Sequence, residues 1–134
     1  GVIPPGSRCD QVCATFDLTA TAAALAGARA DPAAPFDGID LMPMLRGGPP
    51  RARELCWRIA QRGNQKALRS GDWKYLAVDG REYLYDLAAD SGEKHDRKTA
   101  RPEVLVDLQR KYAAWEREML APIPLDASEK LAQP

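Results

Sequence analysis

The sequence has few of the residues from which most catalytic and metal sites are built. Its 134 residues include one histidine and three cysteines. A single histidine excludes any site that needs two, and three sparse cysteines argue against a disulfide framework. So few cysteines are compatible with a cytoplasmic or a periplasmic location, and the sequence does not choose between them.

The chain also lacks net charge and long apolar runs. The 19 Lys and Arg residues balance the 19 Asp and Glu residues, and no run of basic residues forms a patch for nucleic acid. No stretch approaches the ~20 apolar residues of a membrane helix, so we expect no membrane span. Hydrophobic residues nevertheless make up 45% of the chain, which is enough for a folded core.

The beginning of the chain suggests a fragment of a longer protein. It starts at Gly1 with neither Met nor a signal peptide. We therefore interpret residues 1–48 as the end of a larger domain and its connector. Residues 49–120 are interpreted as a C-terminal subdomain, and residues 121–134 as a tail.

Residues 1–48 are predicted to contain a strand-like start at Cys9, a helix and a proline-rich connector. Thr15 or Asp17 can cap the start of the helix, and Gly27 fits the position just past its end. An alanine-rich face can lie close to a large neighbour but builds little core by itself. That face contains Phe16, Ala20, Ala23, Ala24 and Leu25. In the connector, residues 37–45 predict a turn and a short helix anchored by Ile39, Leu41, Met42 and Leu45.

The second part predicts an α+β fold, in which a small four-stranded antiparallel sheet packs against a C-terminal helix. Alternating apolar residues predict strands, and Asp79-Gly80 is a strong hairpin signal. The strands are expected at 54–60, 66–69, 73–78 and 81–87. The third strand is apolar on both faces, so we expect the sheet to be covered on both sides.

The last helix is predicted at residues 102–120, from Pro102 to a point before Pro122. Its stripe at helical spacing provides one cover for the sheet and consists of Val104, Leu105, Leu108, Tyr112, Trp115 and Met119. Nothing else in the chain is expected to cover the second face. The aromatic side chains of the strands (Trp57, Trp73, Tyr75, Tyr83 and Tyr85) are predicted to pack in the core.

Few residues are candidates for a functional site. The polar loop between the first two strands is the most site-like cluster, because Arg62 can pair with an anion and is flanked by polar side chains. His95 lies in a charged loop and can also contact a substrate. The candidate pocket contacts are therefore Gln61, Arg62, Asn64 and His95. We predict no catalytic and no metal-binding residue: Cys9 and Cys13 lack further ligands, and Asp86, Asp90 and Glu93 are predicted to cap turns.

Several segments together resemble the C-terminal portion of a sulfatase, in the alkaline-phosphatase superfamily. In the first part, residues 1–7 and Asp10-Gln11-Val12 resemble the region after the central strand of that family. Residues 17–21 resemble its Asp-x-x-Pro-Thr helix start, with Ala20 in place of Pro. Residues 37–41 resemble its Asp-Gly-x-Asp-Leu segment.

The resemblance continues through the second part and covers about residues 1–120. Residues 66–75 match an Arg-x-Gly-x-Trp-Lys strand pair. Residues 82–87, with Asp90 and Glu93, match a Leu-Tyr-Asp-Leu-x-x-Asp-x-x-Glu segment, with Ser91 where Pro is usual. In the family a large α/β domain covers the second face of the small sheet, which implies such a cover here.

The resemblance implies a parent enzyme that hydrolyses sulfate esters with calcium and a formylglycine residue. The motifs for both lie upstream of this segment in the family, and neither Cys9 nor Cys13 fits the Cys/Ser-x-Pro-x-Arg motif. The implied partners are the remainder of the sulfatase chain and a sulfate-ester substrate. The isolated segment is expected to be inactive and to self-associate through its exposed apolar surface.

Two other readings of the sequence remain open. One is the tail of a phosphonate monoester hydrolase or phosphodiesterase of the same superfamily, which the upstream nucleophile motif would distinguish. The other is an autonomous, non-catalytic module for binding or assembly. Such a module would be monomeric by itself and would expose no apolar sheet face.

Overall fold

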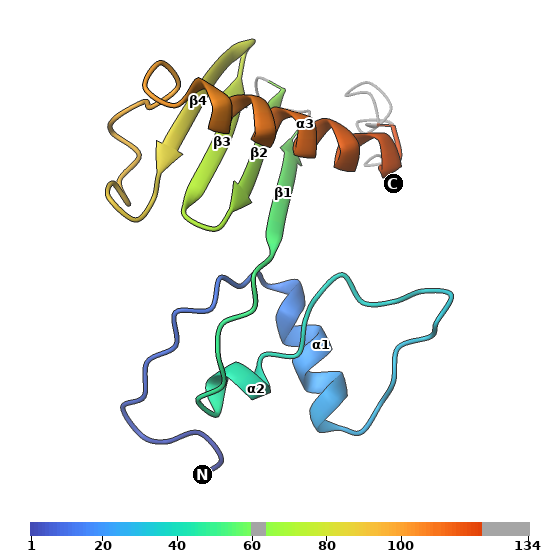
Figure 1. Cartoon of the computed structure of the whole chain (residues 1–134). Coiled ribbons are helices and arrows are strands. Elements are labelled where there is room, and N and C mark those ends of the chain that lie inside the picture. The colour runs from blue at the N-terminus through green and yellow to red at the C-terminus, as the bar shows by residue number, and fades with distance from the viewer. Residues whose placement is uncertain (60–63, 122–134) are drawn as a thin grey trace, which may run out of the picture. The chain divides into compact units, whose positions relative to one another are not determined.

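The computed structural model describes residues 1–59 and 64–121. Contacts divide the chain into an N-terminal unit, Gly1–Ala52, and a C-terminal unit, Arg53–Pro134. The N-terminal unit contains α1 (Phe16–Leu25) and α2 (Met42–Leu45) (Figure 1). The C-terminal unit contains β1 (Glu54–Ile59), β2 (Gln65–Ser70), β3 (Trp73–Val78), β4 (Arg81–Asp86) and α3 (Pro102–Glu118).

The four strands form one antiparallel sheet in the order β1-β2-β3-β4, which confirms the predicted α+β fold. Strand β3 has the predicted bounds, and β2 is longer by one residue at each end. The turn between β3 and β4 is made by Asp79 and Gly80, both with positive φ (50° and 75°). This is the backbone that a two-residue hairpin of right-handed twist requires.

The strand register assigns each side chain to one of two faces, because residues directly opposite each other point the same way. Helix α3 runs across one face, here called the helix face (Figure 1). Its central row across the four strands is Cys56, Leu68, Tyr75 and Leu84. The opposite face, here called the open face, carries the rows Leu55, Arg69, Lys74 and Tyr85, and Trp57, Ala67, Leu76 and Tyr83.

The core of the C-terminal unit lies between the helix face and α3. Leu68 and Leu84 are fully buried there, and they pack in one cluster with Leu108 and Tyr112 of α3. The Tyr75 and Tyr112 rings meet edge to face with centroids 6.0 Å apart, an arrangement that aromatic pairs prefer. Full burial of each leucine contributes about 1.5–3 kcal/mol, so this cluster accounts for much of the unit's stability.

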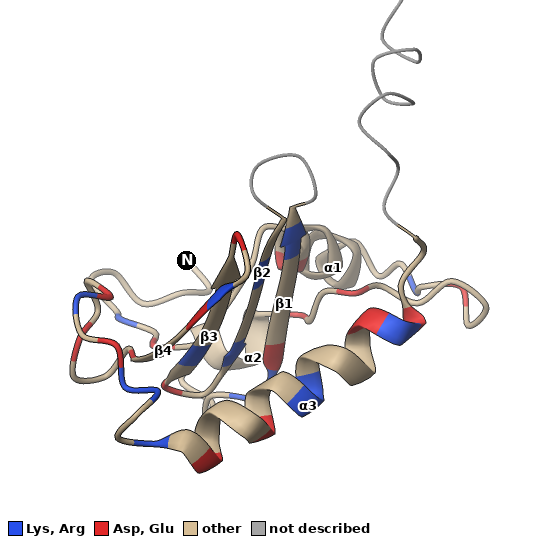
Figure 2. Ribbon diagram, turned by 90° about the horizontal axis from the view of Figure 1, so that it is seen from above, with Lys and Arg blue, Asp and Glu red and all other residues tan. Residues whose placement is uncertain are grey.

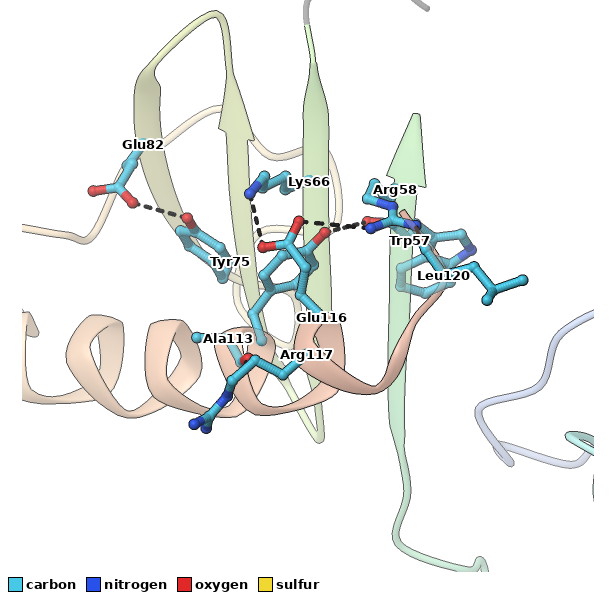
Figure 3. Close-up of polar contacts among 10 residues, drawn as sticks. Trp57, Arg58, Lys66, Tyr75, Glu82, Ala113, Glu116, Arg117 and Leu120 are labelled. Atoms are coloured by element: carbon cyan, nitrogen blue, oxygen red, sulfur yellow. Dashed lines mark hydrogen bonds and ion pairs between the residues drawn. The ribbon is translucent and has the colours of Figure 1, made fainter. Parts of the chain in front are cut away.

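Polar contacts fasten the C-terminal end of α3 to the first two strands (Figure 3). Lys66 Nζ lies 2.8 Å from Glu116 Oε2, and Arg58 Nη2 donates to the carbonyl of Leu120 at 2.6 Å. The helix ends at Glu118 rather than at residue 120, because Met119 takes an extended backbone with ψ 148°. Met119 is therefore 38% exposed and does not continue the apolar stripe, contrary to the prediction.

The N-terminal unit is held by buried polar groups. Asp17, with no exposed surface, accepts hydrogen bonds from the backbone N–H groups of Ala14 (2.7 Å) and Ile39 (2.9 Å). One turn later, Thr21 Oγ1 donates to the Asp17 carbonyl (2.7 Å) and accepts from the N–H of Leu41 (3.0 Å). The two segments that resemble sulfatase motifs, 17–21 and 37–41, therefore bind each other through hydrogen bonds.

Gly38 permits this contact, because a Cβ there would lie 2.4 Å from the carbonyl oxygen of Phe16. The buried side of α1 differs from the predicted one: Asp17, Ala20 and Thr21 are buried, whereas Phe16 and Leu25 are 41% and 61% exposed. No strand forms at residues 9–14, and Met44 joins Leu41 and Met42 as a buried anchor of α2. Helix α1 starts after Thr15 without a side-chain cap.

Candidate functional site

The open face of the C-terminal unit contains a cavity of about 340 Å³. Strands β1, β2 and β3 form its floor, and the segment after β4 forms part of its wall. The lining residues are Trp57, Ile59, Gln65, Ala67, Arg69, Lys74, Leu76, Leu87 and Glu93. Most of these positions follow from the alternation of side chains along each strand, which brings one residue in two to this face.

The rim of the cavity on β1 is strongly apolar and exposed. Trp57 and Ile59 retain 43% and 49% of their surface, so the prediction that Trp57 packs in the core is wrong. The prediction holds for Tyr75 and Tyr85, which are 5% and 9% exposed. Trp57 faces away from α3, and Figure 2 shows α3 along one side of the sheet only. Large apolar side chains exposed next to one another are typical of a surface that binds another surface.

Two cations lie among these apolar side chains. Lys74 Nζ donates to both carboxylate oxygens of Glu93, at 2.6 and 2.8 Å, and both side chains are mostly buried. Arg69 is opposite Lys74 in the sheet, and its Nε donates to the carbonyl of Gly71 at 3.1 Å. In the parts of the chain that the structure describes, no carboxylate pairs with Arg69. The cavity therefore holds one uncompensated positive charge.

The segment after β4 is shaped by carboxylates that accept backbone hydrogen bonds. Asp86 Oδ1 accepts from the N–H groups of Ala88 and Ala89, each at 3.2 Å. Asp90 Oδ2 accepts from Lys94 (2.8 Å) and His95 (2.7 Å). These bonds confirm the turn roles predicted for Asp86 and Asp90, and the Lys74–Glu93 pair holds the segment against the sheet.

The predicted pocket contacts are not gathered at this cavity. Gln61 and Arg62 lie outside the described residues. Asn64 is exposed at the end of the β1–β2 connection, with φ +45°. His95 lies beyond β4, where the N–H of Arg97 donates to Leu84. Because β1 and β4 are opposite edges of the sheet, Asn64 and His95 lie at different edges.

His95 is oriented by Asp90, a contact that the sequence did not indicate. Its Nδ1 lies 3.2 Å from Asp90 Oδ2, while 70% of its side chain remains exposed. The His95 backbone N–H is the main cause of the lowered pKa of Asp90; burial opposes it, and the Lys94 N–H and the His95 imidazole lower the pKa further. Asp90 is therefore a stable carboxylate acceptor.

The cysteines and acidic residues do not form a recognisable metal site in the described residues. Cys9 and Cys13 are exposed free thiols, and Cys56 packs against the core of the sheet. Burial, and secondarily the charge of Glu54, raise the pKa of Cys56 to about 11, so its reactive thiolate is scarce at neutral pH. Within residues 1–59 and 64–121, no group of three His, Cys, Asp or Glu side chains is placed to hold a metal ion. No helix in that part is long and apolar enough to cross a membrane.

Solved structures match most of this chain. Ps i-CgsB, a sulfatase solved with k-i-k-neocarrahexaose, matches 85% of the chain with a TM-score of 0.75 and 28% identity. A sulfatase structure from Bacteroides thetaiotaomicron, described with glycosaminoglycan metabolism, matches 76% with a TM-score of 0.62 and 24% identity. The chain has the fold of a C-terminal sulfatase segment.

The phosphonate monoester hydrolase of Agrobacterium radiobacter also matches 78% of the chain, with a TM-score of 0.52 and 25% identity. The sulfatase-like chain spans only about a quarter of these proteins, 26%, 24% and 25% of their respective lengths. No model of a protein family matches the sequence, and no curated protein does.

Sequence reasoning missed the cavity and its two cations. The signal was present in the strand pattern, because Arg69 and Lys74 occupy positions whose neighbours on the same face are Trp57 and Leu76. Cations flanked by large apolar side chains on one face indicate a surface that contacts something other than water.

Proposed function

We propose that this chain is the C-terminal part of a sulfatase-like hydrolase of sulfuric esters and is inactive by itself. The observation that carries the proposal is the match of 85% of the chain to only 26% of Ps i-CgsB. In this proposal residues 1–48 end the large α/β domain, and residues 49–120 form the subdomain that shapes the substrate pocket. The remainder of the enzyme covers the open face, and in its absence the segment self-associates.

Calcium and formylglycine, in this proposal, belong to the remainder of the enzyme. Within residues 1–59 and 64–121, the side chains are not arranged to hold calcium. The carboxylates of Asp86 and Asp90 are engaged by backbone N–H groups, and neither exposed cysteine has the surrounding motif. Gln61, Arg62, Asn64 and His95 are proposed as contacts to the substrate at the lip of the pocket.

The experiment is an assay of two proteins in parallel with an aryl sulfate and calcium. The purified 134-residue chain is expected to give no turnover above buffer. The protein encoded by the complete reading frame that contains this segment is expected to hydrolyse the sulfate. Turnover by the 134-residue chain would overturn its proposed inactivity, and an inactive complete protein would overturn the sulfatase assignment.

A second candidate function is hydrolysis of a phosphonate monoester, favoured by the match to the Agrobacterium enzyme. The two functions differ in the charge and shape of the ester rather than in the fold of this segment. An aryl phosphonate monoester in the same assay separates them, because the better substrate of the complete protein identifies the class.

A further inference from the structure

We propose that an apolar segment from the remainder of the chain fills the open-face cavity and contributes a carboxylate that pairs with Arg69. This proposal rests on the proposed function, which supplies the remainder of the chain. It goes further by naming the residue that anchors the contact and the chemistry of the partner group.

The cavity is lined by several apolar side chains. The residues that line it include Trp57, Ile59 and Leu76, and Trp57 and Ile59 are about half exposed. When another apolar surface covers the exposed area of these side chains, the free energy gained is roughly 25 cal/mol per Å². Structures of the same fold are about three times as long as this chain, so the remainder of such a protein provides a covering surface of ample size.

The charges that line the cavity do not balance. The cavity is lined by Arg69, Lys74 and Glu93, and Glu93 binds Lys74 through both of its oxygens. Within residues 1–59 and 64–121, the hydrogen bond of the Arg69 side chain goes to the Gly71 carbonyl and no carboxylate pairs with it. Covering the cavity would remove water from this guanidinium, and a buried charge without a partner is strongly unfavourable. The covering segment is therefore required to bring a negative group to Arg69.

The geometry of the Arg69 side chain also favours a carboxylate as its partner. Arg69 is the next-to-last residue of β2, where it is paired with Leu55 of β1 and Lys74 of β3, and its Nε bond to Gly71 restrains the guanidinium. The remaining N–H groups of a guanidinium form a planar fork that matches a carboxylate in a bidentate contact. Lysine provides the charge without this fork, so the two residues are not equivalent here.

The test compares the melting temperature of the same substitution in two proteins. In the complete protein, Arg69→Gln is expected to lower the melting temperature by about 5 °C or more, because it leaves the partner carboxylate buried alone. In the 134-residue chain, which lacks that carboxylate, the same substitution is expected to change it by about 1 °C or less. Arg69→Lys in the complete protein is expected to recover part of the loss.

The matched control is Arg81→Gln, which removes an exposed arginine from the same face outside the cavity. It is expected to change neither melting temperature. The proposal would be overturned if Arg69→Gln left the melting temperature of the complete protein unchanged. It would also be overturned if the substitution lowered the melting temperature equally in the complete protein and in the 134-residue chain, or if the reading frame encoded only 134 residues. Sulfate-ester hydrolysis by the complete protein is measured separately, so loss of the proposed function and loss of the Arg69 contact are distinguishable.

Discussion

The N-terminal and C-terminal units are each stabilised by a different kind of internal contact. In the C-terminal unit a cluster of apolar side chains, with Leu68 and Leu84 fully buried, lies between the sheet and α3. In the N-terminal unit the only residue below 2% exposure is the carboxylate Asp17, and buried Thr21 and Gln11 hold connecting segments by hydrogen bonds. A unit with an apolar core of its own can fold by itself, whereas one held by a few polar contacts depends on what surrounds it.

In the N-terminal unit, single polar side chains connect separate backbone segments. Gln11 accepts from the N–H of Arg51 at 2.6 Å and donates to the carbonyls of Val12 and Arg51. Like Asp17, it uses one side chain to join backbone segments far apart in the sequence. Such contacts fix geometry but bury little apolar surface, which fits the proposed role of this unit as the edge of a larger domain.

The largest expected effect is in the core of the C-terminal unit. Leu84→Ala is expected to lower the free energy of unfolding by about 2–5 kcal/mol, because it removes buried methyl groups and leaves a cavity. Urea denaturation followed by tryptophan fluorescence measures it, since all three Trp residues lie in this unit. Val106→Ala on α3, at a residue 62% exposed, is the control and should cost less than about 0.5 kcal/mol. Equal losses in the two variants would contradict the assigned core.

The sheet and its helix could be predicted because their signals are local. Alternation in residues 54–60, the apolar run at 73–78, the Asp79-Gly80 turn and the stripe that starts at Val104 each indicate one element, and the elements agree with each other. The end of α3 could not be predicted, because Leu120 is held by Arg58, which is 62 residues away in the sequence.

The N-terminal unit and the cavity were harder to predict for a physical reason. The buried side of α1 is set by the hydrogen bonds of Asp17 and Thr21 to residues 39 and 41, and hydrophobic spacing carries no information about such bonds. The cavity depends on strand register, which places Trp57, Arg69 and Lys74 on one face. The loop candidates Gln61 and Arg62 lie outside the described residues, so their roles stay predictions.

An intermediate effect is expected for the buried carboxylate of the N-terminal unit. Asp17→Ala removes the acceptor of the Ala14 and Ile39 N–H groups and should destabilise this unit by about 1.5–3 kcal/mol, the usual range for bonds to a charged group. Hydrogen exchange of the Ile39 and Leu41 amides measures it and should become faster. The urea transition of the C-terminal unit should not move.

The control is Asp31→Ala, because Asp31 accepts a similar bond from the Ala33 N–H at the surface. It should leave the exchange of Ile39 and Leu41 unchanged. If Asp17→Ala instead shifted the transition of the C-terminal unit as strongly as Leu84→Ala, the contrast between the two units would be lost.

The smallest effect is expected for a surface carboxylate, Asp90, that also accepts hydrogen bonds from backbone N–H groups. Asp90, like Asp17, collects backbone N–H groups, but its loop is exposed. Its pKa is lowered, mainly by the His95 N–H, so the folded state binds its proton less tightly than the unfolded state, in which an aspartate titrates near ~3.9. Asp90 therefore stabilises the fold above that value, and the stabilisation is lost as the pH falls through the folded pKa.

Carboxyl carbon shifts followed by NMR from pH 6 to pH 2 should place the midpoint of Asp90 below ~3.9. Stability measured over the same range should fall less steeply in Asp90→Asn than in the unchanged chain, because the variant has no proton to gain at this site. A midpoint at or above 4, or parallel stability curves, would show that the surface carboxylate is not held by its loop. In that case, accepting backbone N–H groups would not by itself stabilise a carboxylate in this chain. The difference between Asp17 and Asp90 would then be due to the burial of Asp17 alone.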